Sequence, residues 1–305
     1  MADVVGNYAG LSEQRSDFSM RLDDVSFLLR RANNVCKGFS IERAAEEASV
    51  ETGEWCADFG CGKGGDVKKY EAAGVWRLWF VDVVEKQLLD LGARVREMRA
   101  SSTLSPAFAC RVVQLDLSSW SGRLGWLSSV RAAGVRFSAI FSHFALHYMC
   151  PTSADLAHMF HIISLTLRDG GIFSAIFSRW EDVGEAWSSL PDGVSSSPLA
   201  TCSRVALARG GVYARFRFEM RGAVEGVVES SLPLNDVMEA AERFGLECVA
   251  RRDLRSLYAE DARAWEWAGR MNRTWQGEGG GGEEQEVRRL MERYVWTAFR
   301  KRTKP

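Results

Sequence analysis

A cluster of glycines most constrains what this chain can fold into. The sequence reads WCADFGCGKGGD from Trp55 to Asp66, so an apolar run comes directly before a turn with four glycines in six residues. The apolar run is typical of a buried strand, and glycines let the backbone turn tightly and approach a ligand closely. A helix that follows such a turn offers free N–H groups at its first residues. The pattern predicts a strand, a ligand-binding turn and a helix in succession.

Strand-like and helix-like segments alternate along most of the chain. We expect strands at residues 55–60, 76–82, 108–116, 137–144, 171–178, 247–251 and 294–300. We expect helices at residues 63–73, 152–167 and 235–244, and a long helix that ends near Arg99. Such alternation predicts a parallel sheet with helices on both faces. Ligands of such a sheet bind beyond the carboxyl ends of its strands, so informative residues are expected there.

Two further regions frame this sheet. Apolar residues within 17–47 predict helical cover ahead of it, so we expect an N-terminal helical region at 1–50 and a main domain at 51–305. Residues 179–231 interrupt the alternation and read as an insertion, with a hairpin-like piece at 212–228. The run GEGGGGEE at 277–284 is typical of a loop.

Composition narrows the class of protein. The 305 residues are 46% hydrophobic, with 39 basic against 40 acidic side chains, which excludes disordered and collagen-like chains. The balanced charge gives no overall attraction to a polyanion, so any such partner must meet a local patch. Residues 288–305 are one candidate patch, because they carry seven basic side chains against Glu292 alone. They also fit a second interpretation, as solvated charges flanking an edge strand.

The cysteines indicate a reducing environment. All seven are scattered, and no CxxC pair occurs, so neither a disulfide framework nor a structural zinc site is indicated. The first residues do not have the pattern of a secretory signal, and no stretch approaches the roughly 18 apolar residues that span a bilayer. We therefore expect an intracellular, soluble protein without membrane contact.

Acidic residues at expected strand ends indicate which ligand the glycine turn receives. Asp82 ends the second strand, where its carboxylate can accept both hydroxyls of a ribose. Asp116 ends the third strand and can accept the amine of an adenine, while Asp58 suits an ammonium group. The phosphate-binding pattern GxxxxGK[ST] is absent, and the literal GxGxxG match is a weak signal alone. A plainer interpretation is that Asp82 and Asp116 cap helices. Together these residues resemble the S-adenosylmethionine methyltransferase core.

Four stretches carry a closer resemblance. They are DFGCGKGGDVKKYEAAG, LLRRANNVCK, FSHFALHYM and EVRRLMERYVWTAFRK. In this order along the chain they resemble the messenger RNA cap guanine-N7 methyltransferases. The resemblance implies a Rossmann-like class I methyltransferase fold of the α/β class. In that fold a mostly parallel seven-stranded sheet carries helices on both faces, with N-terminal helical cover and an inserted substrate-binding subregion.

The resemblance also implies ligands for particular residues. The cofactor would be S-adenosylmethionine, with S-adenosylhomocysteine as product and no metal. Lys37 would hold its carboxylate, and the implied cofactor-binding set is Lys37, Gly60, Asp82, Asp116, His143 and Tyr148. His143 stands where the family has glutamine. The implied substrate-binding set is Asn33, Asn34, Lys63, Lys69, Arg94, Phe144, His147, Glu225 and Tyr294.

The chemistry of several of these residues agrees with the implied substrate. A carboxylate such as that of Glu225 can accept hydrogen bonds from N1–H and the N2 amine of guanine. Lys63 and Arg94 supply cations for a triphosphate bridge. Guanine N7 carries no proton at neutral pH, so no general base is required. We expect His147 and Tyr148 to position the guanine ring. Neither HxxxH nor HxxH is accompanied by further ligands, so we expect no metal site.

Two rival functions remain open. The first is a methyltransferase for another small molecule or a protein. The second is a catalytically idle partner that keeps the fold and assists a capping reaction. For the favoured interpretation, the resemblance implies the capped mRNA 5′ end as substrate, RNA binding and a role in mRNA processing. The resemblance also implies nuclear localisation, with other capping enzymes as candidate partners. A monomer is expected.

Overall fold

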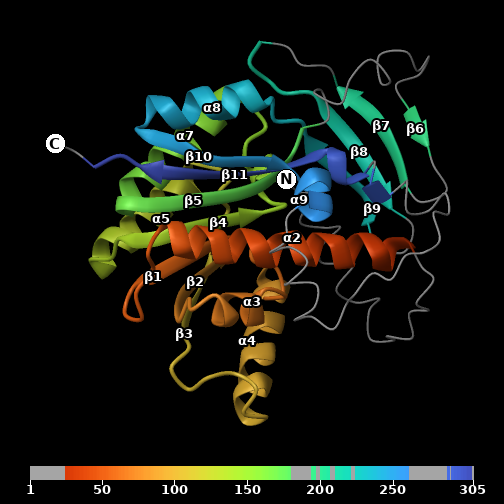
Figure 1. Cartoon of the computed structure of the whole chain (residues 1–305). Helices are drawn as coiled ribbons and strands as arrows, with labels where there is room; N and C mark the ends of the chain where they lie inside the picture. Colours follow the sequence, from red (N-terminus) through yellow and green to blue (C-terminus); the bar gives the residue numbers. More distant parts are fainter. Residues whose placement is uncertain are drawn as a thin grey trace.

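The computed structural model describes residues 25–179, 194–196, 200–206, 210–220, 224–260, 287–288 and 290–303. These residues form one seven-stranded sheet and one four-stranded sheet (Figure 1). The glycine-rich run at 277–284 lies outside the described residues, as do residues 1–24 of the expected N-terminal region.

The larger sheet has the strand order β10-β11-β5-β4-β1-β2-β3. In chain order its strands are β1 Trp55–Phe59, β2 Arg77–Asp82, β3 Ala109–Gln114, β4 Phe137–His143, β5 Leu167–Ser178, β10 Leu246–Asp253 and β11 Tyr294–Lys301. Strand β11 runs antiparallel to both of its neighbours, whereas β5, β4, β1, β2 and β3 run parallel to one another. The expected mostly parallel sheet is confirmed.

Helices cover both faces of this sheet because its strands alternate their buried side chains between two clusters. In β2, Leu78 and Phe80 belong to one cluster, and Trp79 and Val81 belong to the other. The first cluster is closed by helices α2 Val25–Glu47, α3 Val67–Ala72, α4 Glu85–Ala100 and α9 Leu254–Glu260. The second is closed by α5 Trp120–Ala133, α6 Leu146–Met149, α7 Ser153–Thr166 and α8 Leu234–Arg243.

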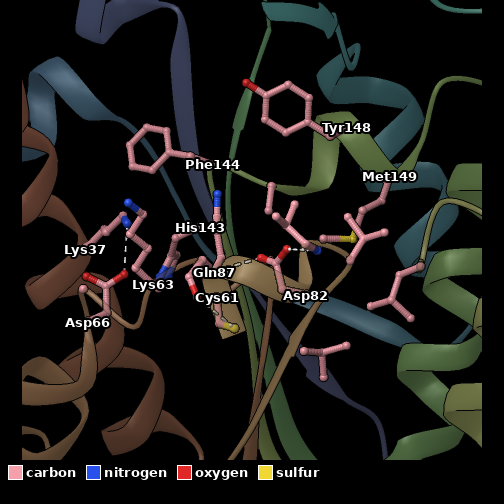
Figure 2. A pocket seen from close by; sticks show the side chains of 18 of the residues that line it. Lys37, Cys61, Lys63, Asp66, Asp82, Gln87, His143, Phe144, Tyr148 and Met149 are labelled. Carbon is pink, nitrogen blue, oxygen red and sulfur yellow. Dashed lines mark hydrogen bonds and ion pairs between the residues drawn. The ribbon is translucent and has the colours of Figure 1, made fainter. Parts of the chain in front are cut away.

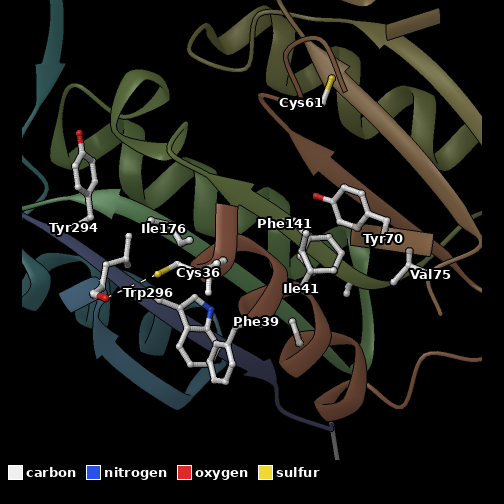
Figure 3. Packing of buried hydrophobic residues seen from close by; sticks show 14 of the residues in the cluster. Cys36, Phe39, Ile41, Cys61, Tyr70, Val75, Phe141, Ile176, Tyr294 and Trp296 are labelled. Atoms are coloured by element: carbon white, nitrogen blue, oxygen red, sulfur yellow. Dashed lines mark hydrogen bonds between the residues drawn. The ribbon is translucent and has the colours of Figure 1, made fainter. Parts of the chain in front are cut away.

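Helix α2 belongs to the same core as the sheet. Figure 3 shows Phe39 of this helix against Trp296 of β11, with ring centroids 5.3 Å apart in an edge-to-face arrangement. Such a pair contributes about 0.5–1.5 kcal/mol beyond its burial. The expected helical cover is therefore present over the described part of the N-terminal region, and it packs as part of the main core.

The insertion contains the smaller, antiparallel sheet. Its strands are β6 Val194–Ser196, β7 Ala200–Ala206, β8 Arg215–Met220 and β9 Val224–Ser230. The expected hairpin is present as β8 and β9. Phe216 and Phe218 of β8 join the same cluster as α2, so one face of the smaller sheet is buried. At the end of β9, the N–H of Leu232 donates to the carbonyl of Ser178 in β5 (3.1 Å), which joins the two sheets.

The structure adds elements that the sequence patterns did not predict. Helix α5 contains Gly122 and Gly125, and these glycines interrupt the periodic pattern of apolar residues that would predict a helix. The residues that cap its two ends are the clearer sequence signal. The Ser119 hydroxyl caps its first turn by accepting from the N–H of Gly122 (3.1 Å). Gly134 ends it in the left-handed conformation. The short helices α6 and α9 and the strands β6 and β7 also went unpredicted.

Candidate functional site

A cavity of about 510 Å³ lies at the carboxyl ends of β1, β2, β3 and β4 (Figure 2). This is where a parallel sheet is expected to bind its ligand. All six residues implied to hold the cofactor line it, namely Lys37, Gly60, Asp82, Asp116, His143 and Tyr148. Four residues implied to hold the substrate also line it, namely Asn33, Asn34, Lys63 and Phe144.

The glycine turn forms the floor of the cavity, and its backbone requires glycine. Gly60, Gly62 and Gly64 have φ angles of 77°, 54° and 68°, a region that side chains disfavour. A Cβ atom on Gly60 would lie 2.4 Å from the Cβ of Ala145 at the start of α6. The glycine turn can therefore pass close to the start of α6 because Gly60 has no side chain.

Two carboxylates stand where β2 and β3 end. Asp82 accepts the N–H of Gly62 at Oδ2 (2.9 Å) and the N–H of Val84 at Oδ1 (3.0 Å). These bonds fix the carboxylate over the glycine turn, while its burial raises its pKa. Asp116 accepts both the N–H and the hydroxyl of Ser118 at Oδ1 (3.0 and 2.5 Å). Both groups are thus oriented acceptors suited to hydroxyl and amine donors.

A three-charge cluster lies at the opposite end of the glycine turn, beside α2. Lys37 Nζ is 2.9 Å from Asp66 Oδ2, and Lys69 Nζ is 2.6 Å from Asp66 Oδ1. Burial by itself would raise the pKa of Asp66. The two ammonium groups outweigh that effect and hold the pKa well below its usual range. Lys37 and Asp66 line the cavity, and Figure 2 shows their contact.

His143 ends β4 as a neutral hydrogen-bond acceptor. The Ser40 hydroxyl donates to the carbonyl of Lys37 (2.9 Å), and Ser40 Oγ lies 3.0 Å from His143 Nε2, so the tautomer with its hydrogen on Nε2 satisfies both contacts. Burial lowers the pKa of His143 to about 3, which keeps the ring neutral near pH 7. Its Nδ1 therefore carries a lone pair, and within the described chain that buried atom has no partner.

Phe144 directly follows in a backbone conformation that is unusual for a large side chain. Its φ is 57°, in the left-handed region. The N–H of Phe144 donates to the carbonyl of Ile176 in the neighbouring strand (2.7 Å), which holds this conformation. The ring lies 5.6 Å from Lys37 Nζ and 5.1 Å from the ring of Tyr294. Backbone strain of this kind is often found where a side chain is held for binding.

A second polar cluster adjoins the cavity at α6, and its centre is Glu229 of β9. Tyr148, which lines the cavity, donates its hydroxyl to Glu229 Oε1 (2.7 Å), and Tyr294 of β11 donates to Oε2 (3.5 Å). His147 Nε2 lies 3.7 Å from Oε1. The N–H of Ser178 donates to His147 Nδ1 (3.3 Å), so the hydrogen of the neutral ring is on Nε2, toward Glu229.

Other implied substrate residues lie elsewhere. Lys69 is 6% exposed and is not part of the cavity lining. Arg94 is exposed on α4 and does not line the cavity either. Glu225 lies in β9, but its side chain is outside the described residues. The assigned roles of these three residues remain predictions.

Sequence reasoning missed several residues at the site, among them Asp66, Glu229 and Gln87. Glu229 is 3% exposed, and its only sequence signal is an acid on the buried side of a strand, two residues after the buried Val227. Gln87 of α4 is 7% exposed and lines the cavity. Its Oε1 lies 3.0 Å from the place a Cβ on Gly62 would take, so Gln87 packs against the glycine turn.

Comparison with known proteins assigns the chain to a family. The model of the mRNA (guanine-N(7))-methyltransferase domain matches residues 2–181. The chain belongs to this family. It is 22% identical over 251 residues to the mRNA cap guanine-N(7) methyltransferase of Saccharomyces cerevisiae, covering 78% of this chain and 55% of that protein. It is 26% identical over 242 residues to the Cryptococcus neoformans enzyme of the same name, covering 76% and 37%. The chain thus spans about half or less of these relatives' length.

Solved structures show the same fold. An S-adenosylmethionine-dependent methyltransferase from Clostridium acetobutylicum superposes with a TM-score of 0.53 at 14% identity, covering 87% of this chain and 91% of that one. A methyltransferase solved with the Haloferax volcanii Trm112 activator also gives 0.53, at 13% identity over 99% of both chains. The protein therefore has the Rossmann-like class I methyltransferase fold.

The described residues lack two features. They contain no group of three or more His, Cys, Asp or Glu side chains placed to hold a metal ion. Within the same residues, no helix has the length and apolar character needed to cross a bilayer.

Proposed function

We propose that this protein transfers a methyl group from S-adenosylmethionine to N7 of the guanine in a capped mRNA 5′ end. Family membership supports the reaction, and the cavity at the strand ends supports the cofactor. The substrate assignment depends on one observation. The polar cluster around Glu229 is complementary to the hydrogen-bonding edge of guanine and adjoins that cavity through Tyr148.

The cavity residues fit the cofactor group by group. Asp82 and Asp116 offer acceptors for ribose hydroxyls and for the adenine amine, over a floor that the glycine turn keeps open. Lys37 offers a cation for the carboxylate of the methionine part. The unpartnered Nδ1 of His143 offers an acceptor for its ammonium group. When bound, the cofactor supplies a methyl group already activated by a positively charged sulfur.

The Glu229 cluster distinguishes guanine from adenine. The guanine edge presents an acceptor at O6 and donors at N1 and N2. The cluster presents the complementary set, with a donor at His147 Nε2 and a carboxylate with two oxygens at Glu229. Adenine has a donor at N6 and an acceptor at N1, so it would leave the buried carboxylate facing a lone pair. A mismatch of this kind with a buried polar group is costly, at about 1–3 kcal/mol or more.

No side chain needs to act as a base in this reaction. Guanine N7 carries a lone pair and no proton at neutral pH. The contribution of the chain is therefore to hold N7 in line with the transferable methyl group, at about 3 Å, while excluding water. His147, Tyr148 and Glu229 would position the base. Asn33, Asn34, Lys63 and Phe144 of the cavity lining, and Arg94 on the outer surface of α4, would bind the nucleoside and its phosphates.

The wider setting is part of the same proposal and is supported by the family alone. We place the reaction in nuclear mRNA processing, beside other capping enzymes, with the protein acting as a monomer. Residues 51–305 would form the methyltransferase domain, covered by residues 1–50, and the insertion at 179–231 would serve the substrate through Glu229.

Methyl transfer from labelled S-adenosylmethionine tests the proposal directly. The acceptors are GpppA and GpppG, with GTP and ATP as comparisons. We expect labelled product on the two caps, with the methyl group on N7, and none on ATP. Cofactor binding without transfer to either cap would contradict the cap assignment and favour a different substrate. Absence of cofactor binding would favour the catalytically idle partner.

Two isosteric variants then test the substrate site. Glu229→Gln replaces one acceptor oxygen with an amide that opposes the guanine donors, so we expect kcat/KM for GpppA to fall about 100-fold, equivalent to about 3 kcal/mol. Affinity for S-adenosylhomocysteine should change little. Glu225→Gln is the matched control, four residues earlier in the same strand. A larger loss in Glu225→Gln than in Glu229→Gln would restore the assignment made from sequence.

A further inference from the structure

Lys69 and Lys37 share one carboxylate but have different surroundings. Lys69 Nζ lies 2.6 Å from Asp66 Oδ1 and donates to the carbonyl of Gly65 (3.4 Å), with its side chain 7% exposed. Lys37 Nζ lies 2.9 Å from Asp66 Oδ2, with its side chain 23% exposed and facing the cavity. Lys69 is therefore buried behind Asp66, and Lys37 lies between Asp66 and the cavity.

The net charge of this trio depends on the buried lysine. One carboxylate and two ammonium groups leave a surplus of one positive charge. The lysines hold the pKa of Asp66 well below its usual range, so this carboxylate remains ionised. Burial raises the pKa of the neighbouring Asp58 to about 7, so the surplus is fully present below that pH, where Asp58 is uncharged. Without Lys69, Asp66 would neutralise Lys37 completely. An anionic group entering the cavity would then meet a neutral pair instead of a cation.

We propose that Lys69 is a positioning residue for the cofactor, which acts through Asp66 to keep Lys37 oriented and in cationic excess toward the cofactor's carboxylate. This inference rests on the proposed function, in which Lys37 receives that carboxylate. The substrate-binding role that the resemblance implies for Lys69 remains a separate prediction, since Lys69 is buried behind Asp66 and is outside the cavity lining.

The arrangement makes the site selective for a ligand with an amino acid part. In the proposed function the nucleoside part is received by Asp82 and Asp116, and Figure 2 shows Asp82 on the opposite side of the cavity from Lys37. Loss of Lys69 should therefore weaken binding of the carboxylate while leaving nucleoside binding intact. A general structural defect would instead weaken both parts together, which gives the experiment its discriminating power.

Two ligands separate these outcomes when their affinities are measured by calorimetry. S-adenosylhomocysteine carries the carboxylate, and 5′-methylthioadenosine has the same nucleoside and sulfur without the amino acid. We expect Lys69→Met to weaken S-adenosylhomocysteine about tenfold or more and to change 5′-methylthioadenosine less than about twofold. Lys69→Arg should retain both affinities. Lys68→Met is the matched control, because Lys68 is the adjacent, more exposed lysine and pairs with Glu71.

A double variant keeps the test decisive if Lys69→Met folds poorly. Combining Lys69→Met with Asp66→Asn removes one charge of each sign, so the surplus on Lys37 is restored. We expect this variant to recover most of the preference for S-adenosylhomocysteine. Equal weakening of both ligands in Lys69→Met, no weakening of either, or a double variant as impaired as the single one would overturn the inference. Failure of the unmodified protein to bind S-adenosylhomocysteine would instead overturn the proposed function on which it rests.

Discussion

At the residue scale, Asp58 carries a buried acid whose ionisation should make stability depend on pH. The side chain is 4% exposed. Burial and the nearby charge of Asp66 raise its pKa from 3.8 to about 7, although the Lys37 ammonium opposes the shift. In the unfolded chain Asp58 ionises near pH 4, whereas the folded protein keeps it protonated until about pH 7. Because the folded state binds more protons, stability should fall as pH rises from about 4 to 7.

Asp58→Asn removes this ionisation. We expect the variant to be more stable than the parent above pH 7, by at most about 4 kcal/mol, with the difference vanishing toward pH 4. Urea unfolding between pH 4 and 8.5 measures it. Asp169→Asn is the control, because Asp169 is half exposed and its pairing with Lys301 is worth about 1 kcal/mol at most. A stability difference that stays constant with pH would contradict the assignment.

At the element scale, α5 is seated directly on the end of β3, and Gly122 permits that contact. A Cβ on Gly122 would lie 1.9 Å from the carbonyl oxygen of Asp116 and 2.6 Å from its carbonyl carbon. Backbone atoms must shift to accept it. We therefore expect Gly122→Ala to displace Asp116 from the cavity wall and to weaken S-adenosylhomocysteine about tenfold, as measured by calorimetry.

Gly125→Ala, one turn later in α5, is the matched control. Its Cβ would meet only the end of the Leu115 side chain, at 3.2 Å. The Leu115 side chain can move away, so Gly125→Ala should stabilise the folded protein by about 1 kcal/mol through the higher helix propensity of alanine. The affinity for S-adenosylhomocysteine should not change. Equal affinities in the two variants would show that α5 does not set the position of Asp116.

The same scale explains what the sequence could predict. The glycine turn with Gly60, the strands of the larger sheet, and Asp82 and Asp116 at strand ends depend on short patterns, in which neighbours in the chain determine the structure. The other cavity residues assigned to the cofactor were implied by the family resemblance. Glu229 depends instead on which face β9 buries. That strand has an irregular register with β8, and Gly226 has a φ of 62°. An irregularity of this kind resets the alternation of side chains, so the sequence could not show that Glu229 is buried beside the cavity, and the resemblance placed the guanine contact at Glu225.

Lys69 illustrates a second limit. A lysine one turn into a helix that follows a glycine turn is typical of an exposed, anion-binding side chain. The packing of α2 against α3 changes this, because it brings Lys37 to the far oxygen of Asp66 and seals Lys69 behind it. Only contacts between segments distant in sequence determine that outcome.

At the scale of the whole molecule, the two sheets divide the site between them. The strands of the larger sheet carry the cavity at their ends, and Glu229 belongs to β9 of the smaller sheet, which lies beside the larger one in Figure 1. The Ser178 hydroxyl of β5 donates to the carbonyl of Ser230 (3.0 Å), which fixes the end of β9 next to α6. Tyr148 then connects the halves, because it lines the cavity and donates its hydroxyl to Glu229.

This shared side chain predicts that the two ligands bind cooperatively. The ligand that binds first orders the Tyr148 side chain, so the second ligand binds with a smaller loss of conformational entropy. We expect saturating GpppA to tighten S-adenosylhomocysteine about fivefold or more, and S-adenosylhomocysteine to tighten GpppA by the same factor, since the coupling free energy is reciprocal. Calorimetry in both orders measures the two factors. In Tyr148→Phe, which loses the hydroxyl and keeps the ring, both factors should fall toward one. Undiminished coupling in that variant would mean that another contact joins the two halves of the site.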